Sequence, residues 1–402
     1  MNSSLSPALA IGCYMLAISC AGLLLRSPWL RNAMQADAPG RQTAIDGLRG
    51  YLAFGVFIHH LVIYYPYLET GVFELPESNF YSQLGRASVA LFFMITGFLF
   101  WGRVLDRRGR VSWGRFLVGR LFRIYPLYLF ALTAVLLIVF TESNGEFRVP
   151  ATDVAMSVTR WLIFQRPDIN GHSGTGDLIA NVSWTLSYEL FFYLTLPCWA
   201  MIFIRRGGWL KLIVSLVCIF VVYKWMGASS VLKHAVLLSF LGGVAAAYWI
   251  RNDRCRAWAQ CKTAAAIALM ALSAVMLGWG NSFALVPLVL LTLFFCIVAS
   301  GNVLFGALSL PSVRWLGEIS YSTYLLHGLV LWLGLVCLPS LLAFDPRSPV
   351  YWTAFMVIGS LLVILLSSAT FMLIERWGID TGRRISARLR EPGRIAPTGL
   401  PQ

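Results

Sequence analysis

Residues 48–67 are LRGYLAFGVFIHHLVIYYPY, an apolar stretch long enough to cross a lipid bilayer. About 20 apolar residues in an α-helix span the ~30 Å hydrocarbon core, and similar runs recur along the whole chain. This stretch nevertheless contains His60, and two further apolar stretches contain Glu189 and His327. A charge at the centre of a membrane helix costs roughly 2.5–3.5 kcal/mol, so ionisable residues there usually face a bundle interior or a wet cavity.

The composition indicates a membrane protein throughout. Of the 402 residues, 58% are hydrophobic and 12% are charged, whereas ordinary globular domains have about 25% charged residues. We therefore predict an all-α, polytopic transmembrane helical bundle of about 10–11 spans with no soluble domain. The expected spans are residues 7–25, 48–67, 83–101, 124–141, 184–204, 210–227, 232–250, 264–281, 284–301, 316–338 and 351–374.

The net charge of +14 would suit a nucleic-acid-binding protein, but its distribution argues against that function. Most of the 32 Lys and Arg residues lie in alternate connections between the expected spans, and the opposite connections include an acidic loop with Glu69, Glu74 and Glu77. The positive-inside rule then predicts an N-terminus outside and a C-terminus in the cytoplasm. We expect the lipid bilayer, and no nucleic acid, as the partner of these charges.

Arg49 lies at the cytoplasmic end of the second expected span, eleven residues before His60. Eleven residues are close to three helical turns, so both side chains share one face, with His60 about 16 Å deeper. The positive charge of Arg49 at the entrance and the neutral imidazole of His60 deeper in the bundle suit an anionic donor whose reactive end extends into the bundle. The alternative is an interfacial arginine and a hydrogen-bonded core histidine, a structural role that we expect for the neighbouring His59.

Two further arginines are a candidate phosphate site. Arg120 and Arg123 are i, i+3 neighbours in Arg120-Leu-Phe-Arg-Ile-Tyr-Pro126, so both guanidinium groups can face one phosphate group. Anchoring to lipid head groups at the membrane interface would explain the pair equally simply.

Glu189 and His327 are the other candidates for chemistry. Glu189 follows the interfacial Trp184 by about 7–8 Å, and His327 lies about 15 Å beyond the cytoplasmic edge of its span. A carboxylate at that depth must pair, take up a proton or contact water. Structural roles remain open for both: Glu189 as the partner of a His or Arg, and His327 as a histidine bonded to nearby hydroxyl groups.

Two polar segments flank this framework. Residues 142–183 form a long connection on the outer side, which we interpret either as an adaptable lid over an acceptor site or as a flexible connector. Residues 377–402 are rich in Arg, Gly and Pro, and we expect a basic, disordered cytoplasmic tail.

Five motifs together resemble the membrane-bound acyltransferase family 3, whose members O-acylate bacterial surface polysaccharides. They are Asp46-Gly-Leu-Arg-Gly50 followed by His60, Phe92-Phe-Met-Ile-Thr-Gly-Phe98, Arg120-Leu-Phe-Arg-Ile-Tyr-Pro126, Trp184-Thr-Leu-Ser-Tyr-Glu-Leu-Phe-Phe-Tyr193 and Ile319-Ser-Tyr-Ser-Thr-Tyr-Leu-Leu-His327. The resemblance covers residues 41–376. Two departures stand out: residues 1–30 form an added transmembrane helix, and Thr96 replaces the usual Ser.

The resemblance implies a multi-pass protein of the bacterial cytoplasmic (inner) membrane. Its donor would be a cytoplasmic acyl-CoA, most often acetyl-CoA, and its acceptor a glycan or lipid-linked saccharide at the outer face. Arg49 and His60 match the essential Arg and His of the family, and Arg120 and Arg123 match its basic pair. Glu189 and His327 match recurrent positions whose roles are less settled. We expect neither a permanently bound cofactor nor a metal.

From these residues we hypothesise that Arg49, Arg120 and Arg123 hold the donor phosphates and that the thioester reaches His60. Burial disfavours the charged imidazole, so a neutral His60 would either deprotonate the acceptor hydroxyl or accept the acyl group itself. We favour the general-base route, with Glu189 or His327 orienting the imidazole or the acceptor. The rival classes are a proton-coupled transporter or flippase that uses the buried His and Glu as a relay and a structural membrane scaffold.

Overall fold

The computed structural model describes residues 7–34, 42–204, 208–227 and 234–389. Within these residues it contains helices and one isolated bridge between Ile169 and His172, and no strand. The first half of the chain forms α1 (Pro7–Leu24), α2 (Pro28–Ala33), α3 (Thr43–Thr70), α4 (Asn79–Asp106), α5 (Trp113–Glu142), α6 (Ala151–Leu162), η1 (Thr175–Ile179) and α7 (Trp184–Phe203). The all-α prediction is confirmed.

The second half of the chain continues the bundle. It forms α8 (Trp209–Gly227), α9 (His234–Trp249), α10 (Asp253–Ala259), α11 (Lys262–Gly278), α12 (Leu285–Ala299), α13 (Pro311–Glu318), α14 (Ser320–Trp332), η2 (Leu333–Cys337), α15 (Leu338–Leu342), α16 (Pro349–Thr370), η3 (Phe371–Glu375) and α17 (Arg376–Arg388). The segments η2 and η3 are π-helical turns, so α14 to α15 and α16 to α17 each run on as one long helical segment.

Eight helical segments among the described residues are long and apolar enough to cross a membrane. They are α1, α3, α4, α5, α7, α8, residues 320–342 and residues 349–388. The other three expected spans correspond to α9, α11 and α12, which are apolar but have only 16, 17 and 15 residues. Helix α9 also turns by 106° into α10.

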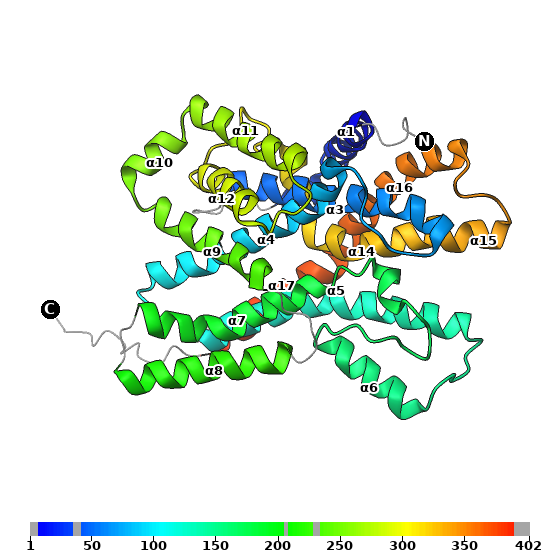
Figure 1. Cartoon of the computed structure of the whole chain (residues 1–402), viewed down its shortest axis with the longest axis horizontal. Helices are drawn as coiled ribbons and strands as arrows, with labels where there is room; N and C mark the ends of the chain where they lie inside the picture. Colours follow the sequence, from blue (N-terminus) through cyan, green and yellow to red (C-terminus); the bar gives the residue numbers. More distant parts are fainter. Residues whose placement is uncertain (1–6, 35–41, 205–207, 228–233, 390–402) are drawn as a thin grey trace.

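Helices α3 and α4 lie at the centre of the bundle. About two thirds of the apolar window of α3 and 72% of that of α4 is buried, compared with 11% for α8. Figure 1 shows α10, α11 and α12 together at one end, and α5, α6, α7 and α8 on the opposite side of α3 and α4. The exposed apolar residues of α8, such as Val214 and Phe220, suit contact with lipid tails.

Small residues bring α4 and α9 into close contact. A Cβ atom on Gly243 would lie 2.0 Å from the carbonyl oxygen of Met94, and one on Gly97 would lie 2.3 Å from that of Phe240. Such backbone approach is the usual means of helix association in membranes. It holds α4, and with it Thr96, in a fixed position beside α7.

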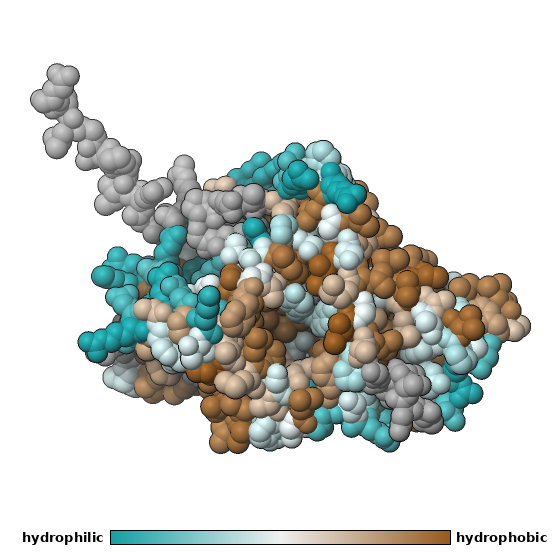
Figure 2. All heavy atoms as spheres, turned by 90° about the horizontal axis from the view of Figure 1, so that it is seen from above, coloured by the Kyte–Doolittle hydropathy of each residue, from teal (hydrophilic) through white to brown (hydrophobic). Residues whose placement is uncertain are grey.

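Figure 2 shows one face of the molecule, with hydrophilic atoms at its margins, hydrophobic atoms between them and a hollow near the middle.

Two further findings correct the sequence-based expectations. Residues 377–388 of the expected disordered tail are helical and belong to α17, while residues 390–402 lie outside the described part. The connection 142–183 is a folded segment that includes α6 and η1, so the flexible-connector interpretation is wrong.

Candidate functional site

Two cavities of similar size lie along α3. One, the histidine cavity, has a volume of about 690 Å³ and is lined by His60 together with residues of the connections at the C-terminal end of α3. The other, the arginine cavity, has a volume of about 680 Å³ and is lined by Arg49, Arg120, Arg123 and Glu189. Val89 and Tyr324 line both cavities, so these two side chains stand where the cavities meet.

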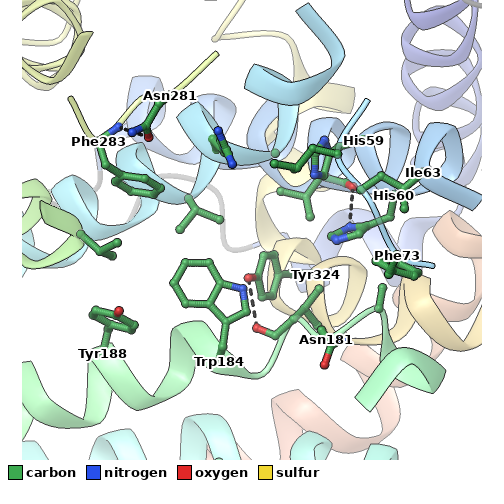
Figure 3. A pocket seen from close by; sticks show the side chains of 18 of the residues that line it. His59, His60, Ile63, Phe73, Asn181, Trp184, Tyr188, Asn281, Phe283 and Tyr324 are labelled. Atoms are coloured by element: carbon green, nitrogen blue, oxygen red, sulfur yellow. Dashed lines mark hydrogen bonds between the residues drawn. The ribbon is translucent and has the colours of Figure 1, made fainter. Parts of the chain in front are cut away.

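His60 extends from α3 into the histidine cavity. Figure 3 shows the ring beside Phe73, with Trp184 and Tyr324 in the middle and Asn281, Phe283 and Tyr188 on the far side. The phenyl ring of Phe73 lies 6.1 Å from the imidazole, centroid to centroid. His60 thus faces an internal cavity and not lipid.

His327 contacts His60 directly. Nε2 of His327 lies 3.0 Å from Nδ1 of His60, while Nδ1 of His327 lies 3.0 Å from the carbonyl oxygen of Thr323. A carbonyl oxygen only accepts, so Nδ1 of a neutral His327 is the donor and its Nε2 is an acceptor. Nδ1 of His60 then carries the proton, which it also directs towards the carbonyl oxygen of Val56 at 3.0 Å. Nε2 of His60 therefore keeps a free lone pair, as a general base requires.

His59 has a separate set of contacts. It is 5% exposed, and its Nδ1 lies 2.7 Å from the carbonyl oxygen of Tyr81. A Cβ atom on Gly85 would lie 2.4 Å from its ring, so the ring fills a tight space between α3 and α4. These contacts fit the structural role expected for His59, although its ring also borders the histidine cavity.

The rim of the histidine cavity combines aromatic and polar side chains. The aromatic ones are Phe73, Trp184, Tyr188 and Phe283, and the polar or charged ones are Glu74, Arg86, Arg166, Asn181 and Asn281. Aromatic faces pack against the C–H faces of sugar rings, and amide and charged groups bond to sugar hydroxyls. This lining has the chemistry that a saccharide needs.

The outer connection contributes Arg166 and Asn181 to this rim. Nη1 of Arg166 donates to the backbone oxygen of Asn181 at 2.7 Å and to its side-chain oxygen at 3.1 Å. Tyr64 donates to the carbonyl oxygen of Asp177 at 3.3 Å and so ties the connection to α3. Burial raises the pKa of Asp177, and its hydrogen bond with Asn181 opposes this effect. The connection is thus a fixed wall of the cavity.

The arginine cavity contains all three predicted donor-binding residues, Arg49, Arg120 and Arg123. Five arginines and two glutamates line it, leaving an excess of positive charge. Arg120 lies over the ring of Phe100, 4.9 Å from its centroid, and bonds to Tyr193. Arg49 interacts electrostatically with Asp46, Glu375 and Glu189. Arg49 and His60 therefore border different cavities along one helix.

Glu189 lies in the arginine cavity and not beside His60. Its Oε2 accepts from the hydroxyl of Tyr193 at 2.7 Å, and its Oε1 accepts from the hydroxyl of Thr96 at 3.5 Å. Of the two groups expected to orient the imidazole, His327 contacts it, whereas Glu189 pairs with hydroxyls and nearby arginines. Thr96, which replaces the usual Ser, keeps the hydroxyl that this contact uses.

Arg123 forms a salt bridge with Glu375, which is 1% exposed. Ser322 donates to the other oxygen of Glu375 at 2.8 Å. Sequence reasoning missed Glu375, although the signal was present: it is a carboxylate directly after the apolar run 351–374. Glu375 also lies in the π-helical turn η3, and such turns frequently mark functional sites. Arg123 is consequently part of both the cavity lining and the core.

Tyr324 is the second residue that sequence reasoning undervalued. In the sequence it stands only as one position of the motif that ends at His327. Its hydroxyl lies 2.9 Å from the hydroxyl of Thr185 and donates to the carbonyl oxygen of Val182 at 3.2 Å. These bonds hold its ring at the junction of the two cavities, where it forms part of the wall between them.

Comparison with known proteins identifies the class of this molecule. Residues 42–369 match a family model described as "Acyltransferase domain", and the chain therefore belongs to this family, as its motifs predicted. It is an enzyme that transfers acyl groups, with the helices of a multi-pass integral membrane protein.

Two curated relatives are similar to the chain. The exopolysaccharide production protein ExoZ of Rhizobium meliloti (strain 1021) is 27% identical over 328 residues, which cover 78% of this chain and 96% of the relative. The acyltransferase MdmB of Streptomyces mycarofaciens is 28% identical over 182 residues, which cover 42% of this chain and 43% of the relative. No solved structure matches the chain.

Proposed function

We propose that this enzyme transfers an acyl group, in the simplest case acetyl, from acyl-CoA at the cytoplasmic side to a hydroxyl of a glycan or lipid-linked saccharide at the outer side. The observation that carries the proposal is the pair of cavities on α3, one lined by arginines and the other by His60, which meet at Tyr324. The distribution of basic residues supports a cytoplasmic position for the arginine cavity. The setting would be the bacterial inner membrane.

The arginine cavity suits the donor. Coenzyme A carries a diphosphate and a 3′-phosphate, and guanidinium groups bind phosphates with charge-assisted, bidentate hydrogen bonds. Arg49 and Arg120 would hold the diphosphate, with Arg123 adding charge despite its salt bridge to Glu375. The flexible pantetheine arm would cover the remaining ~16 Å to the depth of His60.

The histidine cavity suits the acceptor and the chemistry. Nε2 of His60 would take the proton of the acceptor hydroxyl as its oxygen attacks the thioester carbonyl carbon. The C–S bond then breaks, and the proton on His60 passes to the departing thiolate. The products are an ester and free coenzyme A. His327 would stabilise the imidazolium that forms, because it accepts the hydrogen bond from Nδ1.

The alternative route passes the acyl group through His60 itself. Its Nε2 would attack the thioester carbonyl carbon, the C–S bond would break with release of the coenzyme A thiolate, and an acyl-imidazole would form. The acceptor hydroxyl would then attack that acyl group, giving the ester and free His60, and its proton would pass to the thiolate. The hydrogen-bonded pair of His60 and His327 favours the general-base route, since the same arrangement of base and orienting partner serves base catalysis in other enzymes.

Mass spectrometry of surface glycans tests the proposal. Cells that produce the protein should show glycan masses raised by one acyl unit relative to cells that lack it. His60→Ala should abolish this shift while the protein stays in the membrane at its normal level, and Arg49→Ala should chiefly weaken use of the donor. Wild-type acylation in the His60→Ala variant would rule out the mechanism.

A further inference from the structure

The C-terminal helix α17 borders the arginine cavity. Ile379, Gly382, Arg383, Ser386 and Ala387 line the cavity, and their spacing of three and four residues places them on one face of the helix. Arg384 and Arg388 are not among the lining residues. One face of α17, which carries Arg383 and Ser386, thus lines the cavity, whereas Arg384 and Arg388 lie outside it.

Tight packing fixes α17 in this position. A Cβ atom on Gly378 would lie 2.5 Å from the carbonyl oxygen of Phe122, and one on Gly382 would lie 2.7 Å from Cβ of Phe122. Two glycines four residues apart let one helix approach another closely. Just before α17, the Arg123–Glu375 salt bridge joins η3 to α5. The position of Arg383 relative to Arg120 and Arg123 is therefore set by the fold.

Arg383 lies at the mouth of the cavity. Its side chain is 61% exposed, compared with 19% for Arg123. It pairs with Asp380, one turn earlier on the same helix, at 3.3 Å, and exposed pairs of this kind contribute little energy. Ser386, one turn further on, lines the same cavity and offers a hydroxyl donor. A guanidinium and a hydroxyl at an open cationic mouth make a site for a terminal phosphate.

We propose that Arg383 and Ser386 bind the 3′-phosphate of the donor nucleotide, an inference that rests on the proposed use of acyl-CoA. The order of groups along the donor supports it. The thioester, the diphosphate and the ribose 3′-phosphate follow one another along coenzyme A. In the arginine cavity, Tyr324 lies at the junction with the histidine cavity, while the side chain of Arg123 is 19% exposed and that of Arg383 is 61% exposed. The same guanidinium chemistry would also serve an anionic lipid head group at the cytoplasmic surface.

Steady-state kinetics with two donors distinguishes binding of the donor's 3′-phosphate from binding of an anionic lipid head group. The purified full-length enzyme, reconstituted in vesicles with and without anionic lipid, is assayed with acetyl-CoA and with acetyl-3′-dephospho-CoA. Arg383→Ala should raise KM for acetyl-CoA about tenfold, the usual effect of losing a charge-assisted hydrogen bond. It should leave KM for the dephospho donor unchanged. Arg384→Ala, on the same helix but outside the cavity, is the matched control and should leave both values unchanged.

Three results would overturn the inference. They are an unchanged KM for acetyl-CoA in Arg383→Ala, an equal rise for both donors, or an effect that follows the anionic lipid content of the vesicles instead of the donor. Failure of the proposed function itself looks different, because the wild-type enzyme would then consume neither donor.

Discussion

At the scale of single residues, His59 and His60 are adjacent in the chain but have different partners. His59 bonds to a backbone carbonyl in a tight space between helices, whereas His60 bonds to His327 and faces a cavity. The sequence predicted this difference from the alignment of His60 with Arg49 on one helix face. It did not predict the contact between His60 and His327, because residue spacing within one helix does not show which residues of another helix lie against it.

The first prediction concerns His327. If it holds Nδ1 of His60 protonated, His327→Ala should lower kcat by about 10²-fold, within the usual range for general-base catalysis. His327→Gln should recover much of this loss, because the amide oxygen can accept the same hydrogen bond. KM for acetyl-CoA should stay close to the wild-type value in both variants. Equal kcat values for the Ala and Gln variants would show that His327 does not act through that bond.

The second prediction concerns Tyr324. Its ring separates the cavities, so Tyr324→Ala should give outer water access to the thioester and raise hydrolysis of acetyl-CoA in the absence of acceptor. Tyr324→Phe retains the ring and should keep hydrolysis at the wild-type level. Release of free coenzyme A measures both variants. If Tyr324→Ala hydrolyses acetyl-CoA no faster than the wild-type enzyme, the ring does not keep outer water from the thioester.

At the scale of helices, the apolar runs predicted the spans well and the C-terminal segment poorly. The expected spans all correspond to helices, because hydrophobic length alone largely decides insertion. Helix α17 was missed because its order comes from packing: Gly378 and Gly382 fit against Phe122, a contact that composition does not reveal. The basic, Gly-containing sequence of that segment indicated a disordered tail for the same reason.

The third prediction tests the close contact of α4 and α9. Gly243→Ala would place a methyl group against the backbone of α4, and overpacking of this kind costs about 1–3 kcal/mol. We expect a lower midpoint of thermal unfolding in detergent. Gly12→Ala in α1 is the control, because a Cβ atom there meets no atom within 4 Å. A decrease of the same size in both variants would show that close contact is not the cause.

At the scale of the whole molecule, the bundle contains two cavities, which in our proposal receive the donor and the acceptor separately. The polar residues were all identifiable from the sequence, but their grouping was not. Glu189 was expected either to orient the imidazole or the acceptor, or to pair with a His or Arg, and the structure places it with the arginines. Tyr324 from α14 lies where the two cavities meet, held by its contact with the hydroxyl of Thr185, and the spacing within a single span does not reveal this division.

In the proposed mechanism the donor enters through the arginine cavity and gives up its acyl group at His60. The most direct test uses proteoliposomes of known protein orientation, with labelled acetyl-CoA added only on the side of Arg49 and a saccharide acceptor enclosed on the other. Our account predicts labelled acceptor inside with the wild-type enzyme, and none with His60→Ala although that variant still binds acetyl-CoA. Labelled acceptor with His60→Ala, or labelling only when acetyl-CoA is supplied on the acceptor side, would contradict it.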